Sequence, residues 1–199
     1  EGMKLPTPNS QFPRWLRLSR ATAVILGVGC WALGVCAGCA APRAETDGAL
    51  VVAIQSAPNN LDPRIGTDDN SQRVSQLVFS YLMTLDENLR VVPALAGRLE
   101  NPDPLTYVAH LRRGVKFHDG HELTSKDVVY TFTSLMAPDF ISPRKGAYRI
   151  VESIAALDDY TVRFRLKEAF GSFPVQLVMP IVPAGAGPEL GTFPIGTGP

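Results

Sequence analysis

Four side chains that can bind metal ions lie close together near the middle of the chain: His118, Asp119, His121 and Glu122. Imidazole nitrogens and carboxylate oxygens are common zinc ligands, and a zinc-bound water is a nucleophile for hydrolysis. If these side chains converged, they would form a metal-dependent hydrolase built on His118 and His121. Such a site needs three or four ligands held in a preformed geometry.

The spacing of these residues favours a structural role instead. They flank Asp119-Gly120, a typical turn pair in which glycine supplies a positive φ and the aspartate bonds to the backbone. Two histidines on one helix face, as in His-Glu-x-x-His, would be a stronger metal signal. We therefore interpret His118 and His121 as polar residues beside a turn, and we expect no catalytic residue, no metal and no cofactor.

The elements on either side must position this turn. Apolar and polar residues alternate over 115–118, which predicts a strand end. Thr124 stands three residues before Asp127, the spacing of a capping box, and an apolar helix face follows. This helix should end before Pro138, because proline disfavours helical geometry in the residue that precedes it.

Upstream of the turn, the pattern predicts a strand, a loop and the clearest helix of the chain. Residues 50–54 are typical of a buried strand, and residues 55–62 of the loop that follows it. A helix should begin at Ser71, with its cap among the three preceding residues and an apolar face that includes Leu77 and Leu82.

The other elements are mostly short strands. Residues 94–96 favour a short helical turn, and residues 107–111 alternate like a strand that should pair with 115–118 across an Arg-Gly turn. Residues 150–157 and 161–166 predict two strands joined by an Asp-Asp turn.

Two further patterns lie near the end of the last strand. The alternating charges of Arg163, Arg165 and Lys167 mark a solvent-facing side, with a binding patch for an acidic ligand as the alternative. Residues 170–179 favour a short helix.

The composition is that of an ordinary globular protein. The chain has 199 residues, 45% of them hydrophobic, and a formal net charge of zero. Without residues 1–38 it has 15 basic and 18 acidic residues, a net charge of about −3. Such a balance offers no attraction to a phosphate backbone, so we expect no nucleic-acid partner.

The first 38 residues have the pattern of a signal peptide. Arg14, Arg17 and Arg20 precede an uncharged, mostly apolar run over 21–37 that ends in small residues. A membrane-spanning helix is the alternative, but it needs about 20 apolar residues and this run is rich in glycine. We expect export to the periplasm or cell envelope.

The three cysteines predict how the exported protein is anchored. Cys30, Cys36 and Cys39 all lie in or just after the apolar run, so no disulfide can stabilise the rest of the chain. Ala37-Gly38-Cys39 resembles a bacterial lipobox, which predicts lipidation of Cys39 and membrane anchoring; Cys36 and simple cleavage are the alternatives. Residues 39–48 would then be a tether to a domain that covers 49–199.

Several motifs, in this order and spacing, resemble the family 5 extracellular solute-binding proteins, the dipeptide and oligopeptide receptors of ABC importers. The resemblance extends from Leu50 to Pro199. It rests on Leu61-Asp62-Pro63, the helix after Ser71 with Pro93-Ala94-Leu95-Ala96, residues 111–120, Leu123-Thr124 with Asp127-Val128, and residues 194–199.

The resemblance implies a mixed α/β (α+β) fold of the periplasmic-binding-protein-like type II class. In that fold two lobes are joined by crossing strands, close on a ligand and present it to a membrane permease. It implies a binding protein instead of an enzyme, and a monomer at full length. Only part of the first lobe and the small extra domain are expected in this chain, as a truncated N-terminal portion. A naturally short exported protein used for interaction or sensing is the alternative.

The resemblance also implies a ligand and its contacts. Family members grip an extended peptide by backbone bonding, although others take nickel, heme or sugars. The aspartate that pairs with the peptide amino terminus belongs to a portion that this chain does not contain. The ligand-contacting residues carried over are Gln55, Ser56, Ala57 and Asn59 in the loop after the first strand, and Gly196 and Thr197 near the end.

Overall fold

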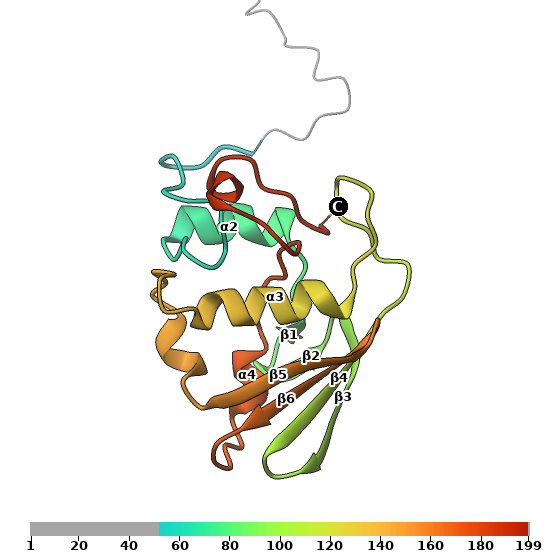
Figure 1. The fold of residues 1–199 in the computed structure, drawn as a ribbon. Helices are drawn as coiled ribbons and strands as arrows, with labels where there is room; N and C mark the ends of the chain where they lie inside the picture. The colour runs from blue at the N-terminus through green and yellow to red at the C-terminus, as the bar shows by residue number, and fades with distance from the viewer. Residues whose placement is uncertain (1–51, 199) are drawn as a thin grey trace, which may run out of the picture. The chain divides into compact units, whose positions relative to one another are not determined.

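The computed structural model describes residues 52–198, and this range forms one compact unit (Figure 1). The predicted signal peptide, the tether and Cys39 lie outside the described residues. Within residues 52–198, none of the helices has the length and apolar character that a membrane crossing requires.

A four-stranded antiparallel sheet is the largest element of the fold. Its strands are β3 (Ala96–Asp103), β4 (Thr106–Leu111), β5 (Val151–Asp158) and β6 (Thr161–Leu166), arranged in the order β3-β4-β6-β5. The predicted strands over 150–157 and 161–166 are confirmed, and the turn between them is closed by the Tyr160 amide, which donates to the Asp158 carboxylate.

The core lies between this sheet and helix α3 (Ser125–Met136), which runs across one face of the sheet in Figure 1. Phe164 of β6 is fully buried and meets Phe132 of α3 edge to face, with ring centroids 5.2 Å apart. The residues that alternate with it, Arg163 and Arg165, are exposed, as predicted. The capping box of Thr124 and Asp127 starts α3, and the helix ends before Pro138.

Shorter elements complete the unit. A hairpin joins β1 (Met83–Leu85) to β2 (Val91–Pro93), helix α2 (Asp69–Val78) precedes it, and α4 (Phe173–Gln176) is the short helix predicted within 170–179. Two 3₁₀ helices, η1 (Lys145–Tyr148) and η2 (Pro188–Gly191), lie in the connections.

Two predicted strand features are wrong. Residues 52–54 form no strand: Val52 is 55% exposed, because no other described segment pairs with it. Residues 115–118 do not pair with β4, since β3 and β6 already occupy both of its edges. They form a small local hairpin instead, in which the Phe117 amide donates to His121 and the Leu123 amide to Val115.

Two helical predictions also need correction. Residues 94–96 form no helical turn, because the Leu95 and Ala96 amides donate to Tyr81 and Leu82 carbonyls at 3.0 and 2.9 Å, and Ala96 begins β3. Helix α2 ends at Val78, and its buried face carries Ser71 and Ser75 while Leu77 is 53% exposed. On this face the Ser71 hydroxyl accepts a hydrogen bond from the Asn60 amide of the preceding loop at 3.2 Å, whereas the Ser75 hydroxyl has no partner among the described residues.

Candidate functional site

The two histidines beside the Asp119-Gly120 turn are held by different partners. Nδ1 of His121 lies 2.5 Å from Oδ1 of Asp119, and the His121 ring stacks on Phe117. The His118 ring instead contacts the carbonyl oxygen of Gly198 through Nε2, at 3.1 Å. Within residues 52–198 no three His, Cys, Asp or Glu side chains are grouped so as to hold a metal ion.

Glu122, the fourth potential ligand, is engaged in a third set of contacts. Its Oε1 accepts hydrogen bonds from the Gly114 amide at 2.8 Å and the Tyr160 hydroxyl at 2.9 Å. These two bonds hold the pKa of the Glu122 carboxyl below its usual range, since both favour the charged form. The four side chains therefore stabilise the turn and the residues beside it, with different partners for His118, for the Asp119–His121 pair and for Glu122.

The predicted ligand loop lies beside the N-terminal end of α2. Ser56 is its contact with the helix, because Nδ2 of Asn70 donates to its Oγ at 2.6 Å. Gln55 helps to line a hollow of about 230 Å³ shared with Asn70 and Arg73. Ala57 and Asn59 are exposed and do not line this hollow.

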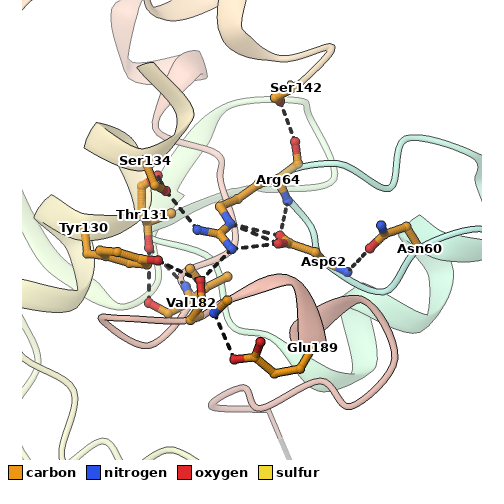
Figure 2. Close-up of polar contacts among 11 residues, drawn as sticks. Asn60, Asp62, Arg64, Tyr130, Thr131, Ser134, Ser142, Val182 and Glu189 are labelled. Carbon is orange, nitrogen blue, oxygen red and sulfur yellow. Dashed lines mark hydrogen bonds and ion pairs between the residues drawn. The ribbon is translucent and has the colours of Figure 1, made fainter. Parts of the chain in front are cut away.

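Below the loop, the chain turns inward to a buried ion pair that sequence reasoning did not single out. Asp62 and Arg64 are 1% and 2% exposed, and Nη2 of Arg64 lies 2.7 Å from Oδ2 of Asp62 (Figure 2). The Asp62 carboxylate also accepts from the Arg64 amide and Nε. Asn60 fixes the entry to this turn, since its Oδ1 accepts from the Asp62 amide at 2.8 Å.

Arg64 joins this turn to the rest of the unit. Its Nη1 donates to Ser134 of α3 at 2.9 Å, and its Nη2 donates to the carbonyl of Ala186 at 3.2 Å (Figure 2). Its guanidinium also lies over the ring of Phe140, 4.9 Å from the centroid. Burial opposes the charge, but the hydrogen bonds and charge of Asp62 outweigh it, so the pKa of Arg64 lies above its ordinary value.

The second predicted ligand element, with Gly196 and Thr197, packs against the C-terminal end of α2. The Gly198 amide donates to the Val78 carbonyl at 2.8 Å, and the Ser80 hydroxyl donates to the Thr197 carbonyl at 3.1 Å. A Cβ atom at Gly196 would lie 2.0 Å from the Val78 oxygen, so only glycine fits this approach.

His118 holds this segment from the other side. Its amide donates to the Gly196 carbonyl at 2.9 Å, and its Nδ1 accepts from the Gly196 amide at 3.4 Å. With Nε2 facing the Gly198 carbonyl, one imidazole spans three residues of the segment. In the sequence, His118 is recognisable only as a histidine at the start of a turn. Its spacing from other residues does not predict a contact with residues about 80 positions away.

The structure does not bring the two predicted ligand elements into one pocket. They lie at opposite ends of α2, and at about 1.5 Å per residue the eight steps from Asn70 to Val78 span roughly 12 Å. This arrangement places two short, backbone-rich segments at the two ends of one helix.

Solved structures define the class of fold. The described unit resembles the oligopeptide-binding protein AppA of Bacillus subtilis in complex with a nonapeptide, with a TM-score of 0.66, 32% identity, and coverage of 72% of this chain and 31% of that one. It also resembles the periplasmic binding protein DppA of Helicobacter pylori in complex with the peptide STSA, with a TM-score of 0.65, 30% identity, and coverage of 72% and 34%. The chain therefore has part of a type II periplasmic-binding-protein fold.

The family follows from the sequence comparisons. The profile described as bacterial extracellular solute-binding proteins, family 5, middle part, matches residues 90–199. The glutathione-binding protein GsiB of Pectobacterium atrosepticum is 32% identical over 194 residues, which cover 94% of this chain and 35% of that protein. AppA of Bacillus subtilis is 35% identical over 134 residues, 67% of this chain and 25% of that protein. The chain belongs to the family 5 extracellular solute-binding proteins.

The chain spans only about a quarter to a third of the length of these relatives. All of the relatives named above are binding proteins by name, which agrees at family level with the expectation that the protein is not an enzyme.

The buried ion pair predicts a large difference between two arginine substitutions. Arg64→Met should lower the free energy of unfolding by about 3–5 kcal/mol, because it leaves the Asp62 carboxylate buried and unpaired. Arg73→Met removes an exposed pair with Asp69 and should cost less than about 1 kcal/mol. Urea denaturation measures both. The double variant Asp62→Leu with Arg64→Met should recover part of the loss; equal costs for Arg64→Met and Arg73→Met would contradict a structural role for the pair.

The close approach at Gly196 predicts a second effect. Gly196→Ala should destabilise the protein by about 1–3 kcal/mol and increase hydrogen exchange at residues 196–198, because the new methyl group meets backbone that cannot move aside. Gly146→Ala is the matched control, since a Cβ atom there meets nothing within 4 Å. If the two variants exchange and unfold alike, the segment is not held as described.

Proposed function

We propose that the protein containing this chain is the substrate-binding component of an ABC-type peptide importer, and that the chain supplies part of its first lobe. Support comes from the family and from AppA and DppA, whose structures hold peptides. NikZ of Campylobacter jejuni, in complex with Ni(L-His), has a similar fold with a TM-score of 0.67 and 26% identity over 75% of this chain and 32% of that one, so the same frame also serves other ligands.

The feature of this chain that supports a peptide best is the backbone of the loop. Among residues 52–198, no backbone partner is found for the amide and carbonyl groups of Gln55, Ser56 and Ala57, and their side chains are exposed. The Asn59 amide instead lies against the carboxylate of Asp68 and helps to lower its pKa. Free main-chain donors and acceptors in a segment outside the sheets can bond to a peptide backbone by strand addition once the ligand aligns with them. Gly196 and Thr197 are more fully engaged, and we propose that they orient the chain beside the ligand.

Peptide binding should stabilise the intact protein against heat. We expect a nonapeptide or trialanine to raise the melting temperature, because a ligand present at 100 times its Kd adds about 2.7 kcal/mol to the free energy of unfolding. Reduced glutathione and nickel-histidine serve as comparison ligands. Stabilisation by nickel-histidine alone would overturn the peptide assignment.

Loop variants test whether the backbone carries the contact. In strand addition, alternate residues point their amide groups to the ligand, so either Ser56→Pro or Ala57→Pro should weaken peptide binding about tenfold through one lost hydrogen bond. The other proline variant and Ser56→Ala should bind as the parent does. If neither proline variant weakens binding, the loop does not contribute backbone bonds.

We further propose that residues 1–38 are a lipoprotein signal peptide, that residues 39–48 are a tether, and that residues 49–199 belong to the solute-binding domain. The lipid on Cys39 would hold the exported monomer at the envelope, near the permease subunits of the importer. Export agrees with the extracellular family.

Cysteine substitutions test this anchor. Cys39→Ser should abolish incorporation of labelled palmitate and move the protein from the membrane to the soluble fraction, because two buried acyl chains are needed for stable attachment. Cys36→Ser is the matched control and should remain labelled and membrane-bound. Loss of label in Cys36→Ser instead would assign the lipid to the other cysteine.

A further inference from the structure

A second hollow, of about 540 Å³, lies beside the part of α2 that carries Gln72 and Gln76. These two residues are one helical turn apart and so share a face of α2. Tyr81 and Thr84 from the segment that follows, and Arg144 from the turn before η1, contribute the other polar side chains. Segments about 70 residues apart in the sequence thus meet at one concave surface.

Arg144 has no acidic partner in this hollow. Within residues 52–198 no carboxylate lies within ion-pair distance of its guanidinium. Its Nε is buried and has no hydrogen-bond partner, while its backbone amide donates to Oγ of Ser142 at 3.1 Å. Buried donors without partners are uncommon in folded proteins, so Arg144 is short of partners among the described residues, and it is also a residue that lines the hollow.

The lining selects for negative charge. Among the described residues that line the hollow, Arg144 alone is charged, and the amides of Gln72 and Gln76 and the hydroxyls of Tyr81 and Thr84 can all donate hydrogen bonds. Burial raises the pKa of the Tyr81 hydroxyl, although the charge of Arg144 and the side chain of Gln76 act the other way, so this hydroxyl stays a neutral donor.

We propose that this hollow binds a carboxylate group, with Arg144 as its charged partner and Gln72 and Gln76 as neutral donors. The planar fork of a guanidinium matches the two oxygens of a carboxylate. One arginine also balances a single negative charge, whereas a phosphate carries nearly two. The site is distinct from the ligand loop, which contacts α2 through Asn70, two residues before Gln72 and therefore on a different side of the helix.

The carboxylate can come from a free acid or from an acidic side chain. The rim of the hollow includes Leu85, which is 41% exposed, and the half-buried Val178. An apolar rim around a single cation suits a carboxylate carried beside an apolar group. Both sources share the same chemistry at Arg144, and the experiment separates them.

The test follows the guanidinium resonances of Arg144 by NMR in the intact protein during titration with acetate and succinate at constant ionic strength. If the hollow is open, we expect a saturable downfield shift that is absent in Arg144→Gln and weakened about tenfold in Arg144→Lys, since lysine lacks the fork. If an acidic side chain of the protein already occupies the hollow, the resonances are downfield from the start and do not shift when acetate is added. They then move upfield only when the pH is lowered through the range in which carboxyl groups titrate.

Two controls make the result specific. Arg90→Gln changes an exposed arginine in the turn between β1 and β2 and should leave the acetate response intact. Gln76→Leu keeps the charge of Arg144 and should weaken acetate binding without changing the fold. The proposal is overturned if the Arg144 resonances do not move under any of these conditions, if Arg144→Gln still gives the same saturable response, or if inorganic phosphate binds more tightly than acetate.

Discussion

The buried pair of Asp62 and Arg64 is the interaction on which the arrangement of the chain's candidate ligand elements depends. Two charges removed from water are tolerated only when every remaining donor and acceptor finds a partner. Arg64 meets this demand with Asp62, Ser134 and the Ala186 carbonyl, and these partners belong to three separate parts of the unit. Because the pair cannot move without leaving a buried charge unpaired, the C-terminal end of the loop before it is held in place.

This anchored end explains how the exposed loop over residues 55–59 can still have a defined position. Residues 55–59 make few contacts of their own, but Asn60 and Asp62 at their end are bonded, and the Leu61 amide donates to the Gly191 carbonyl at 3.0 Å. At the other end of α2, the glycine segment is held by backbone bonds and by the His118 ring. The loop and the glycine segment lie at opposite ends of helix α2, so the length of the helix sets their separation.

The sequence predicts an element correctly where the interactions that form it are between residues close together in the chain. The capping box of Thr124 and Asp127 and the turn glycine at 120, with a φ of 92°, need only near neighbours, and both were predicted. The strands over 150–166 were predicted because alternation reports one buried face. The errors arose where a distant segment decided the outcome. Residues 94–96 form no helical turn because they bond to Tyr81 and Leu82, and residues 115–118 are excluded from β4 because β3 and β6 take both of its edges.

The candidate site shows the same division. The ligand loop was placed by resemblance, but its supporting ion pair and the contact of His118 with Gly198 join residues two to 80 positions apart, and only folding brings the distant ones together. His118 and His121 can be proposed as metal ligands from the sequence because the type of each side chain is known from it. The carbonyl and amide groups that they bond to are present in every residue and therefore carry no signal.

The chemistry of these elements also limits what they can select. If residues 55–59 bind a ligand as proposed, their main-chain groups can bond to the backbone of an extended ligand but cannot distinguish its side chains. Asp69 and Arg73, which line the hollow beside Gln55, pair with each other at 2.8 Å and so offer little net field to a ligand there. Under the proposed function, these elements would set the register and direction of a bound chain, whereas the choice between a peptide, a metal complex and another solute would require side chains that face the loop from across the ligand.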